Sequence, residues 1–413
     1  MASIFSIGLP KINTTGYLTR LCKISKNYNA AQVAFIKRLA YKEKRNKPAP
    51  FPYWKKRYNL YHQVFDPMVY RFDENTKLVV VDGLPAVGKT KFCEKLADEL
   101  GMLYMPAPTH EEIFIDKSGF DRRTLDAELP FYARTYDLER FLENPNDGRV
   151  PWFQLLFFLM RYEQYMNASL HILSTGQGVI LNRCVYSDIV FMRAMVNAGY
   201  IKEPVLNRYM LYRDITFPNL LRPNLIIYLD APIELVKNKI KERGRPQEAN
   251  SKVFTTQYLS DLEKLYKQKY LKPLSGHSHL LIYDWSKEGN FMDVIESIEN
   301  TNFDDYDNGK QTDWLFMTKA EVLEKRLFYD ERRALFIDLE EDIPVDFPRE
   351  LYLTPSEAKQ AEKVFENNPA VAYAPGFNPN RGDKFLWKLP SRRFERFGLR
   401  LTPRDLINQV NRE

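Results

Sequence analysis

A glycine-rich segment between a strand-like run and a helix-like run constrains the fold of this chain more than any other feature. Residues 83–90 read Gly-Leu-Pro-Ala-Val-Gly-Lys-Thr and fit the pattern G-x-x-x-x-G-K-S/T. They follow the apolar run Lys77–Asp82 and precede the helical spacing of Lys89–Leu100. Gly83 and Gly88 allow a tight turn whose N–H groups, together with the helix N-terminus, attract phosphate.

The last two residues of this segment are candidates to contact phosphate and a metal ion. Lys89 would neutralise phosphate charge, and the Thr90 hydroxyl is a candidate ligand for Mg²⁺. A glycine-containing turn beside a surface lysine is the alternative. The position of the segment between a strand and a helix favours a phosphate-binding loop.

Short β-rich runs alternate with helical stretches along the middle of the chain. The apolar runs are Lys77–Asp82, Gly178–Asn182, Asn224–Asp230 and Leu280–Trp285, with a weaker one at Met102–Met105. The helical stretches are Lys89–Leu100, Trp152–Thr175, Val185–Ala198, Ile233–Arg243 and Thr255–Leu271. Continuous apolar runs are typical of strands covered on both faces, and their alternation with helices predicts a parallel sheet. We therefore predict an α/β fold with a parallel five-stranded sheet flanked by helices, and ligands beyond the carboxyl ends of the strands.

Composition and charge exclude several classes of protein. The 413 residues include only three cysteines, and no apolar run approaches the ~20 residues that span a bilayer. A reducing compartment and a soluble or membrane-peripheral protein follow. Residues 1–50 carry 10 Lys/Arg and one acid, residues 381–413 carry nine basic and four acidic residues, and the part between carries 41 basic and 49 acidic residues. An acidic body with basic ends argues against nucleic-acid binding.

The composition divides the chain into four segments. Residues 1–48 are basic and rich in Ser, Thr and Asn, which predicts a mitochondrial transit peptide; a flexible basic arm for an acidic partner is the alternative. Residues 49–75 form an aromatic-rich N-terminal arm, and residues 76–300 form the α/β domain. Residues 301–413 mix helical stretches with prolines and aromatic residues. That mixture suits an arm that lies on a partner, and packing on the chain's own domain is the alternative.

Polar residues follow the third and fourth strand-like runs. Residues 182–188 read Asn-Arg-Cys-Val-Tyr-Ser-Asp, and Gln154 and Arg161 lie seven residues apart on one face of the preceding helix. A glutamine amide can hydrogen-bond a base edge in two directions, whereas a merely polar helix face is the alternative. Arg243 and Arg245 end a basic stretch after the fourth run. They either cover bound phosphates or terminate a solvated helix.

These residues, taken with the glycine-rich loop, resemble the deoxyribonucleoside kinase superfamily. Its members carry an E-R-S-x-x-S-D run at this strand end, a glutamine on the preceding long helix, and an arginine-bearing lid over the phosphates. The resemblance implies that Gln154 and Asp188 read a base, with Arg161 in the same pocket, and that Arg183 lies on the phosphate side. It also implies a bound purine nucleotide, either ATP, ADP or a deoxynucleotide, with Mg²⁺ as a companion.

Two carboxylates of the kinase pattern are missing. Ala107 stands where the kinases place a general-base glutamate, and Asn182 stands where their E-R-S glutamate helps to organise the metal. A methyl group cannot accept a proton, and a neutral amide is a poor ligand for Mg²⁺ beside a triphosphate. General base catalysis is typically worth 10²–10⁴-fold, so the chemistry is expected to be impaired. Glu111 or Glu112 would substitute only if the loop folds back.

A narrower resemblance covers roughly residues 50–388. Residues 174–181 (STGQGVIL), 186–200 (YSDIVFMRAMVNAGY) and 373–378 (YAPGFN) are similar to signatures of one branch of the superfamily. That branch is the family of alpha subcomplex subunit 10, an accessory subunit of mitochondrial NADH:ubiquinone oxidoreductase (complex I). Family members often retain the E-R-S glutamate, and the stretch after Lys388 extends beyond the family pattern.

This resemblance implies a function in the respiratory chain without catalysis by this chain. The expected protein is a non-catalytic accessory subunit on the matrix side of the inner membrane, with other complex I subunits as partners and a structural nucleotide site. FAD has been attributed to the family, but no feature of the sequence supports it. One alternative is an active mitochondrial deoxyribonucleoside kinase, which the loop favours and Ala107 and Asn182 oppose. The other is a scaffold that binds acidic partners through its basic ends.

Overall fold

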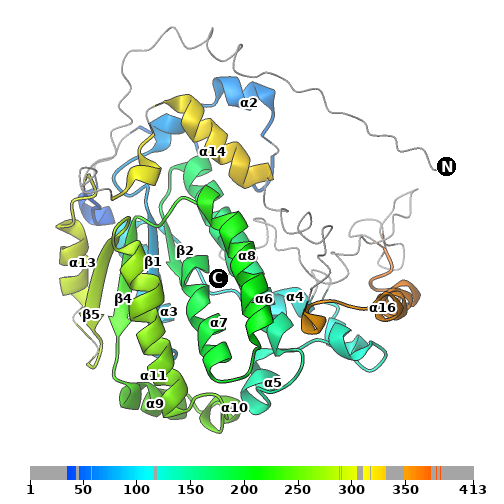
Figure 1. The fold of residues 1–413 in the computed structure, drawn as a ribbon. Helices are drawn as coiled ribbons and strands as arrows, with labels where there is room; N and C mark the ends of the chain where they lie inside the picture. The colour runs from blue at the N-terminus through cyan, green and yellow to red at the C-terminus, as the bar shows by residue number, and fades with distance from the viewer. Residues whose placement is uncertain are drawn as a thin grey trace.

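The expected parallel sheet is confirmed in the computed structural model (Figure 1). Its strands are β1 Leu78–Gly83, β2 Leu103–Met105, β3 Val179–Asn182, β4 Leu225–Asp230 and β5 His279–Asp284, in the order β2-β3-β1-β4-β5. All neighbours are parallel, and Val80 of the central strand pairs with Leu181 on one side and Ile226 on the other. β1 and β3 are buried along their whole length, which explains their continuous apolar sequence.

The structure describes most of the chain between residues 35 and 373. The described residues are 35–42, 46–56, 58–115, 119–287, 289, 291–304, 310–316, 318–331, 348–373, 378 and 382. Most of the predicted transit peptide and nearly all of the stretch after residue 373 lie outside them. Among the described helices, none is both long and apolar enough to cross a membrane.

The helices expected from the sequence are present, and several more accompany them. They are α2 Leu60–Phe65, α3 Lys89–Leu100, α4 Glu111–Phe114, α5 Leu138–Glu143, α6 Val150–Thr175, α7 Asp188–Asn197, α8 Glu203–Thr216, α9 Ile233–Glu242, α10 Pro246–Ala249, α11 Thr256–Leu265, α12 Lys272–Leu274, α13 Phe291–Glu299, α14 Lys319–Glu331 and α16 Pro355–Asn367. Gly176 ends α6 in a left-handed conformation, where a Cβ would lie 2.4 Å from the Arg71 carbonyl oxygen. Only glycine fits this helix end.

One expected helix is interrupted next to the site. The stretch Thr255–Leu271 forms α11, which continues into the π-helical turn η7 Tyr266–Leu271 and then α12. Such turns are rare and often lie at functional sites. Here the turn buries Tyr266 and Tyr270 beneath the carboxyl ends of the central strands.

The segments on both sides of the α/β domain pack against its body. Figure 1 shows α2 and α14 over one end of the sheet, with α5, α9 and α10 at the other. The hydroxyl oxygen of Tyr329, on α14, accepts a hydrogen bond of 2.7 Å from the main-chain N–H of Leu221.

 This bond ties α14 to the chain just before β4. At the other flank, Phe365 of α16 packs with Leu125 and Leu129. The described parts of residues 301–413 therefore pack on the chain's own domain, as the alternative reading of this segment predicted.

Part of the basic leader also belongs to the folded body. Ile36 is fully buried, and Arg38 forms an ion pair of 3.0 Å with Glu299 of α13. Lys42 and Lys47 both pair with the buried carboxylate of Asp73. The described residues at the end of the leader thus contribute to the core and to its ion pairs.

Candidate functional site

The glycine-rich loop adopts a backbone shape that suits anion binding. Gly83, Ala86 and Gly88 have φ angles of 152°, 63° and 92°, so three of its residues lie in the region that L side chains rarely adopt. A Cβ on Gly83 would lie 2.7 Å from the Leu229 carbonyl oxygen, because β1 and β4 approach closely there. Alternating backbone conformations of this kind direct N–H groups into one concave site, and the N-terminus of α3 adds its dipole.

Two cations converge on one carbonyl oxygen of this loop. The Lys89 Nζ donates to the carbonyl oxygens of Gly83 at 3.1 Å and Leu84 at 2.5 Å, and the Arg183 Nη2 donates to that of Gly83 at 3.3 Å. Burial lowers the pKa of Lys89 well below its ordinary value, and the nearby Arg183 lowers it further. An anion bound at the loop would raise the pKa of Lys89 again, because it would pair with the positive charges of Lys89 and Arg183.

Thr90 and Asn182 meet at the start of α3. The Asn182 Nδ2 donates to the Thr90 Oγ1 at 3.3 Å, so the amide contacts the residue that was expected to ligate Mg²⁺. The Asn182 Oδ1 is buried and has no hydrogen-bond partner. Among the described residues, no cluster of three or more His, Cys, Asp or Glu side chains could hold a metal ion. Any Mg²⁺ here would depend on Thr90 and on phosphate oxygens.

Sequence reasoning missed a buried carboxylate at the end of β1. Asp82 is fully buried, and its Oδ1 accepts a hydrogen bond of 3.2 Å from the Tyr266 hydroxyl. Burial raises the pKa of Asp82, although the positive charges of Arg183 and Lys89 act in the opposite direction. Its Oδ2 has no hydrogen-bond partner. The sequence feature that could have revealed it is the position of Asp82, an acidic residue at the end of an apolar run and directly before the glycine-rich loop.

The three residues expected in the base pocket lie together. Gln154 and Arg161 project from α6 toward Asp188, the first residue of α7. The Gln154 Nε2 lies 3.2 Å and 3.1 Å from the two carboxylate oxygens of Asp188, and the Arg161 Nη1 donates to its Oδ1. Burial raises the pKa of Asp188, whereas Arg161 lowers it. The amide donors of Gln154 are therefore engaged within the chain.

An aromatic ring connects this cluster to the phosphate loop. The guanidinium groups of Arg161 and Arg183 lie 5.0 Å and 4.5 Å from the ring centroid of Phe191. Arg161 also lies 5.1 Å from the ring centroid of Phe157. Cations stacked on aromatic rings are held in place by the ring quadrupole. Phe191 thus brings the Gln154 cluster next to the Arg183 side of the loop.

The expected lid arginines have another partner in this structure. Arg243 and Arg245 lie at the turn between α9 and α10, where both form ion pairs with Glu248, at 3.5 Å and 3.2 Å. Arg243 is also among the positive charges that lower the pKa of Lys89. The positive charge of Arg243 therefore acts on Lys89 in the loop, although its ion pair is with Glu248.

Of the two glutamates that follow Ala107, Glu112 is held in a turn and Glu111 is exposed. Ala107 is half-buried in the loop after β2, and Glu111 is exposed. The Glu112 Oε1 accepts hydrogen bonds from the main-chain N–H of Thr109 at 3.0 Å and from its hydroxyl at 3.3 Å. Burial raises the pKa of Glu112, although these bonds lower it. The glutamate thus closes the turn before α4.

Comparisons with known proteins agree with this architecture. A family model described as Deoxynucleoside kinase matches residues 79–308. NADH dehydrogenase (ubiquinone) 1 alpha subcomplex subunit 10, mitochondrial, from Mus musculus is 33% identical over 340 residues, which are 81% of this chain and 90% of that protein. The chain belongs to this subunit 10 family, on a deoxynucleoside kinase fold. A deoxyguanosine kinase of Dictyostelium discoideum is 29% identical over 228 residues, 55% of this chain and 70% of that protein. A solved deoxyadenosine kinase from M. mycoides with bound dATP has 17% identity and a TM-score of 0.40, over 54% of this chain and 98% of its own.

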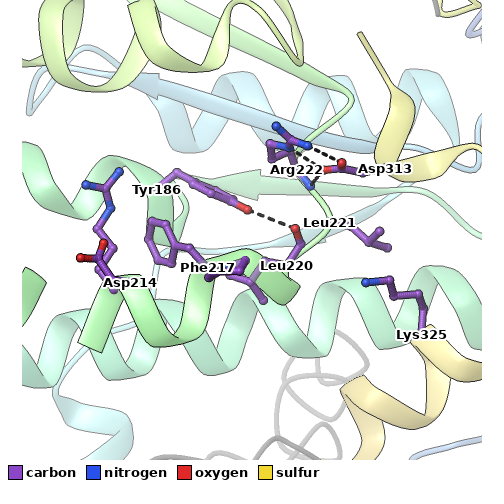
Figure 2. Close-up of a pocket in the computed structure, with 10 residues that line it drawn as sticks. Tyr186, Asp214, Phe217, Leu220, Leu221, Arg222, Asp313 and Lys325 are labelled. Carbon is purple, nitrogen blue, oxygen red and sulfur yellow. Dashed lines mark hydrogen bonds and ion pairs between the residues drawn. The ribbon is translucent and has the colours of Figure 1, made fainter. Parts of the chain in front are cut away.

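A second hollow lies away from this site. A cleft of about 520 Å³ opens near the start of β4, beside α14 (Figure 2). Arg222 and Asp313 lie side by side in its lining, with 2.6 Å between Nε and Oδ2, and Lys325 reaches it from α14. Tyr186 donates to the Leu220 carbonyl oxygen at 3.4 Å on its floor. The paired Arg222 and Asp313 join the C-terminal segment to the body.

Proposed function

We propose that this chain is a mitochondrial accessory subunit of respiratory complex I that binds a purine nucleotide structurally and catalyses no phosphoryl transfer. It would lie on the matrix side of the inner membrane, contact other complex I subunits, and support assembly and stability of the complex. The observation that carries the proposal is the match to the mouse subunit 10, which extends over 90% of that protein.

The residues of the phosphate loop fit the phosphates of a nucleotide. The loop offers N–H groups at Gly88 and the start of α3, and Lys89 and Arg183 already point at the Gly83 carbonyl oxygen. Bound phosphate would take over the donors of Lys89 and pair with its desolvated charge. A nucleotide that binds only the folded chain stabilises it by mass action, by about 2.7 kcal/mol at one hundred times its Kd.

Three features of the chain argue against phosphoryl transfer. Ala107 has no group that could accept a proton from an attacking hydroxyl. Glu112, a half-buried glutamate five residues after Ala107, is bonded to Thr109. Asn182 offers Thr90 a neutral amide where a carboxylate would organise Mg²⁺. Loss of a general base alone typically costs 10²–10⁴-fold in rate.

Native-gel fractionation of mitochondria tests membership of the complex. Mitochondrial membranes are solubilised gently and separated under native conditions, and antibodies detect this chain and a core complex I subunit. We expect both in the same large band, and we expect depletion of this chain to reduce the amount of that band. A chain found only as a free monomer would refute the proposal.

Calorimetry of the purified chain tests the nucleotide site. ATP and ADP should raise the thermal midpoint of the wild-type chain, and Lys89→Ala should weaken their binding at least about tenfold, because a charge-assisted contact to phosphate is lost. Lys91→Ala is the matched control, since Lys91 is exposed on the same helix. Equal nucleotide affinity in wild type and Lys89→Ala would exclude the loop as the site.

An active deoxyribonucleoside kinase remains the second candidate, favoured by the family match over residues 79–308. The purified chain is mixed with Mg-ATP and the four deoxynucleosides, and phosphorylated products are separated by chromatography. Turnover at about 1–100 s⁻¹, as in kinases, that disappears in Lys89→Ala would establish this candidate. We expect turnover at least about a hundredfold below that range.

A further inference from the structure

A buried histidine lies among aromatic rings beside the cluster that holds Gln154. His110 follows β2, just before α4, and only 5% of its surface is exposed. Its ring is nearly parallel to that of Phe153, with 4.7 Å between centroids and an angle of 14°. It is also stacked on Phe114 at 5.7 Å and touches Phe157 edge-on at 4.1 Å. The imidazole is therefore held by stacking.

Phe153 stacks with a second ring as well. Phe141 of α5 lies 5.1 Å from it at an angle of 29°. Phe114, Phe153 and Phe157 form an aromatic cage around His110, and Phe141 backs the Phe153 wall of this cage. A cage of flat apolar walls is selective for a planar ring, because stacked rings contact each other over their whole faces.

The polar atoms of His110 are only partly engaged. Burial lowers the pKa of His110 to about 3, although a hydrogen bond with the Phe153 main chain acts in the opposite direction, so its ring is neutral at physiological pH. Its Nε2 is buried and has no side-chain or main-chain partner within hydrogen-bond distance. Stacking on the neighbouring rings therefore accounts for much of the position of the imidazole.

The cage adjoins the groups that would recognise the edge of a planar heterocycle. Phe157, which contacts His110, also lies under the guanidinium of Arg161, and Arg161 binds Asp188 beside Gln154. Here these groups bond to one another, and an amide, a guanidinium and a carboxylate are the kinds of donor and acceptor that the edge of a nucleobase requires. Flat walls and a mixed polar edge are the chemistry of a nucleobase site.

We propose that His110 fills the position that a nucleobase would take in this cage, so that the chain blocks its own nucleoside half-site. The phosphate loop remains available, and a nucleotide would be held there through its phosphates. The inference deepens the proposed nucleotide site and rests on it only for the phosphate half. A ligand without phosphate, such as a deoxynucleoside, then has no place to bind.

Binding of deoxyadenosine and ADP to three versions of the full chain tests this inference. The versions are wild type, His110→Ala and His171→Ala. His171 is the matched control, because it is also a buried histidine with a lowered pKa, about 4, but it contacts Tyr53 and Gln177 outside the cage. Titration calorimetry measures affinity, and the thermal midpoint with and without ligand shows that each version is folded.

We expect deoxyadenosine to bind only to His110→Ala, at least tenfold more tightly than to wild type or His171→Ala, while all three bind ADP alike. Wild type that binds deoxyadenosine as tightly as His110→Ala would overturn the inference. So would a folded His110→Ala that binds ADP but no deoxyadenosine. Failure of all three to bind ADP would refute the phosphate half and leave the deoxyadenosine comparison intact.

A variant with a smaller change covers the case in which His110→Ala does not fold. His110→Val removes the ring but keeps an apolar side chain against Phe153 and Phe157, and it should gain deoxyadenosine binding in the same direction. A folded His110→Val that binds no deoxyadenosine would also overturn the inference. The wild-type measurement needs no variant and contradicts the inference directly if deoxyadenosine binds.

Discussion

At the residue scale, Gly83 shows how one position serves both the fold and the site. Its carbonyl oxygen accepts hydrogen bonds from Lys89 and Arg183, so it collects the cations that would meet a phosphate. Its missing side chain leaves room for the Leu229 carbonyl oxygen of the neighbouring strand. The backbone therefore turns out of β1 and into the loop without a clash.

Replacement of Gly83 by alanine should destabilise the chain. The new Cβ would lie 2.7 Å from the Leu229 oxygen, at a φ of 152° that alanine rarely adopts. We expect the free energy of unfolding to fall by roughly 1–3 kcal/mol, as measured by urea denaturation. Gly276→Ala is the control, because no atom lies within 4 Å of its added Cβ. Equal loss in both variants would contradict the close approach of β1 and β4.

At the scale of elements, α14 holds the N-terminal arm on the body. Arg326 is fully buried, and its guanidinium lies 3.4 Å from the ring centroid of Tyr58 and 5.2 Å from that of Phe51. The same helix accepts a bond from the Leu221 N–H through Tyr329. One helix thus connects two regions that are far apart in the sequence.

Loss of the Arg326 guanidinium should loosen this arm. Arg326→Met keeps much of the side-chain volume but removes the contact between cation and ring, and we expect a loss of about 2 kcal/mol in the free energy of unfolding. Limited proteolysis should then cut residues 46–56 faster. Arg349→Met is the control, because Arg349 stacks on Tyr132 at 4.2 Å but is partly exposed. The inference about the arm fails if cleavage there is unchanged.

The end of the basic leader should matter for stability. Deletion of residues 1–34 leaves the buried Ile36 in place, and deletion of residues 1–38 removes it together with the Arg38–Glu299 ion pair. The longer deletion should be less stable than the shorter one by about 2 kcal/mol from Ile36 alone. Denaturation of both truncated chains measures this. Two equal midpoints would show that Ile36 is not a core residue.

At the scale of the whole molecule, different elements lie at the two ends of the sheet. The phosphate loop and the Gln154 cluster lie where the strands end, with α9 and α10 nearby, whereas α2 and α14 cover the opposite end (Figure 1). The phosphate loop and the pair α2 and α14 therefore lie at opposite ends of the strands, whereas α16 lies on the side of α4 (Figure 1). A partner that docks on α2 and α14 would leave the loop free.

Buried histidines should make the stability of the whole chain depend on pH. Burial lowers the pKa of His171 to about 4 and that of His110 to about 3, from an ordinary value of 6.5. Between pH 6.5 and 4 the unfolded chain binds protons that the folded chain does not, so the free energy of unfolding falls as the pH falls. Each histidine contributes a slope of about 1.4 kcal/mol per pH unit within this window.

Removal of one histidine measures its share of this slope. Urea denaturation of wild type and His171→Asn is compared at pH 7.5, 6 and 5. Below pH 6.5 the free energy of unfolding of the variant should fall less steeply with pH, because unfolding of the variant takes up about one proton fewer. Above pH 7 the two curves should run parallel, because both states are then neutral at this residue. Parallel curves down to pH 5 would show that His171 takes up its proton in the folded chain.

The sequence by itself determined the sheet, its helices and the phosphate loop. Strands buried on both faces must be apolar throughout, and a loop that binds phosphate needs glycine at Gly83 and Gly88, so both features are visible in local sequence. The family could also be predicted, because its motifs are short and contiguous. The clustering of Gln154 with Asp188 was predicted from that resemblance.

Only the tertiary structure decided how distant side chains pair. The stacking of His110 on Phe153 and Phe157 and the contact of Tyr266 with Asp82 join residues that are far apart in the sequence and whose spacing shows no pattern. Such contacts depend on how helices pack over the sheet, and packing is set by the whole core at once. The local sequence therefore determines elements, and the packed core determines which polar groups are free to bind a ligand.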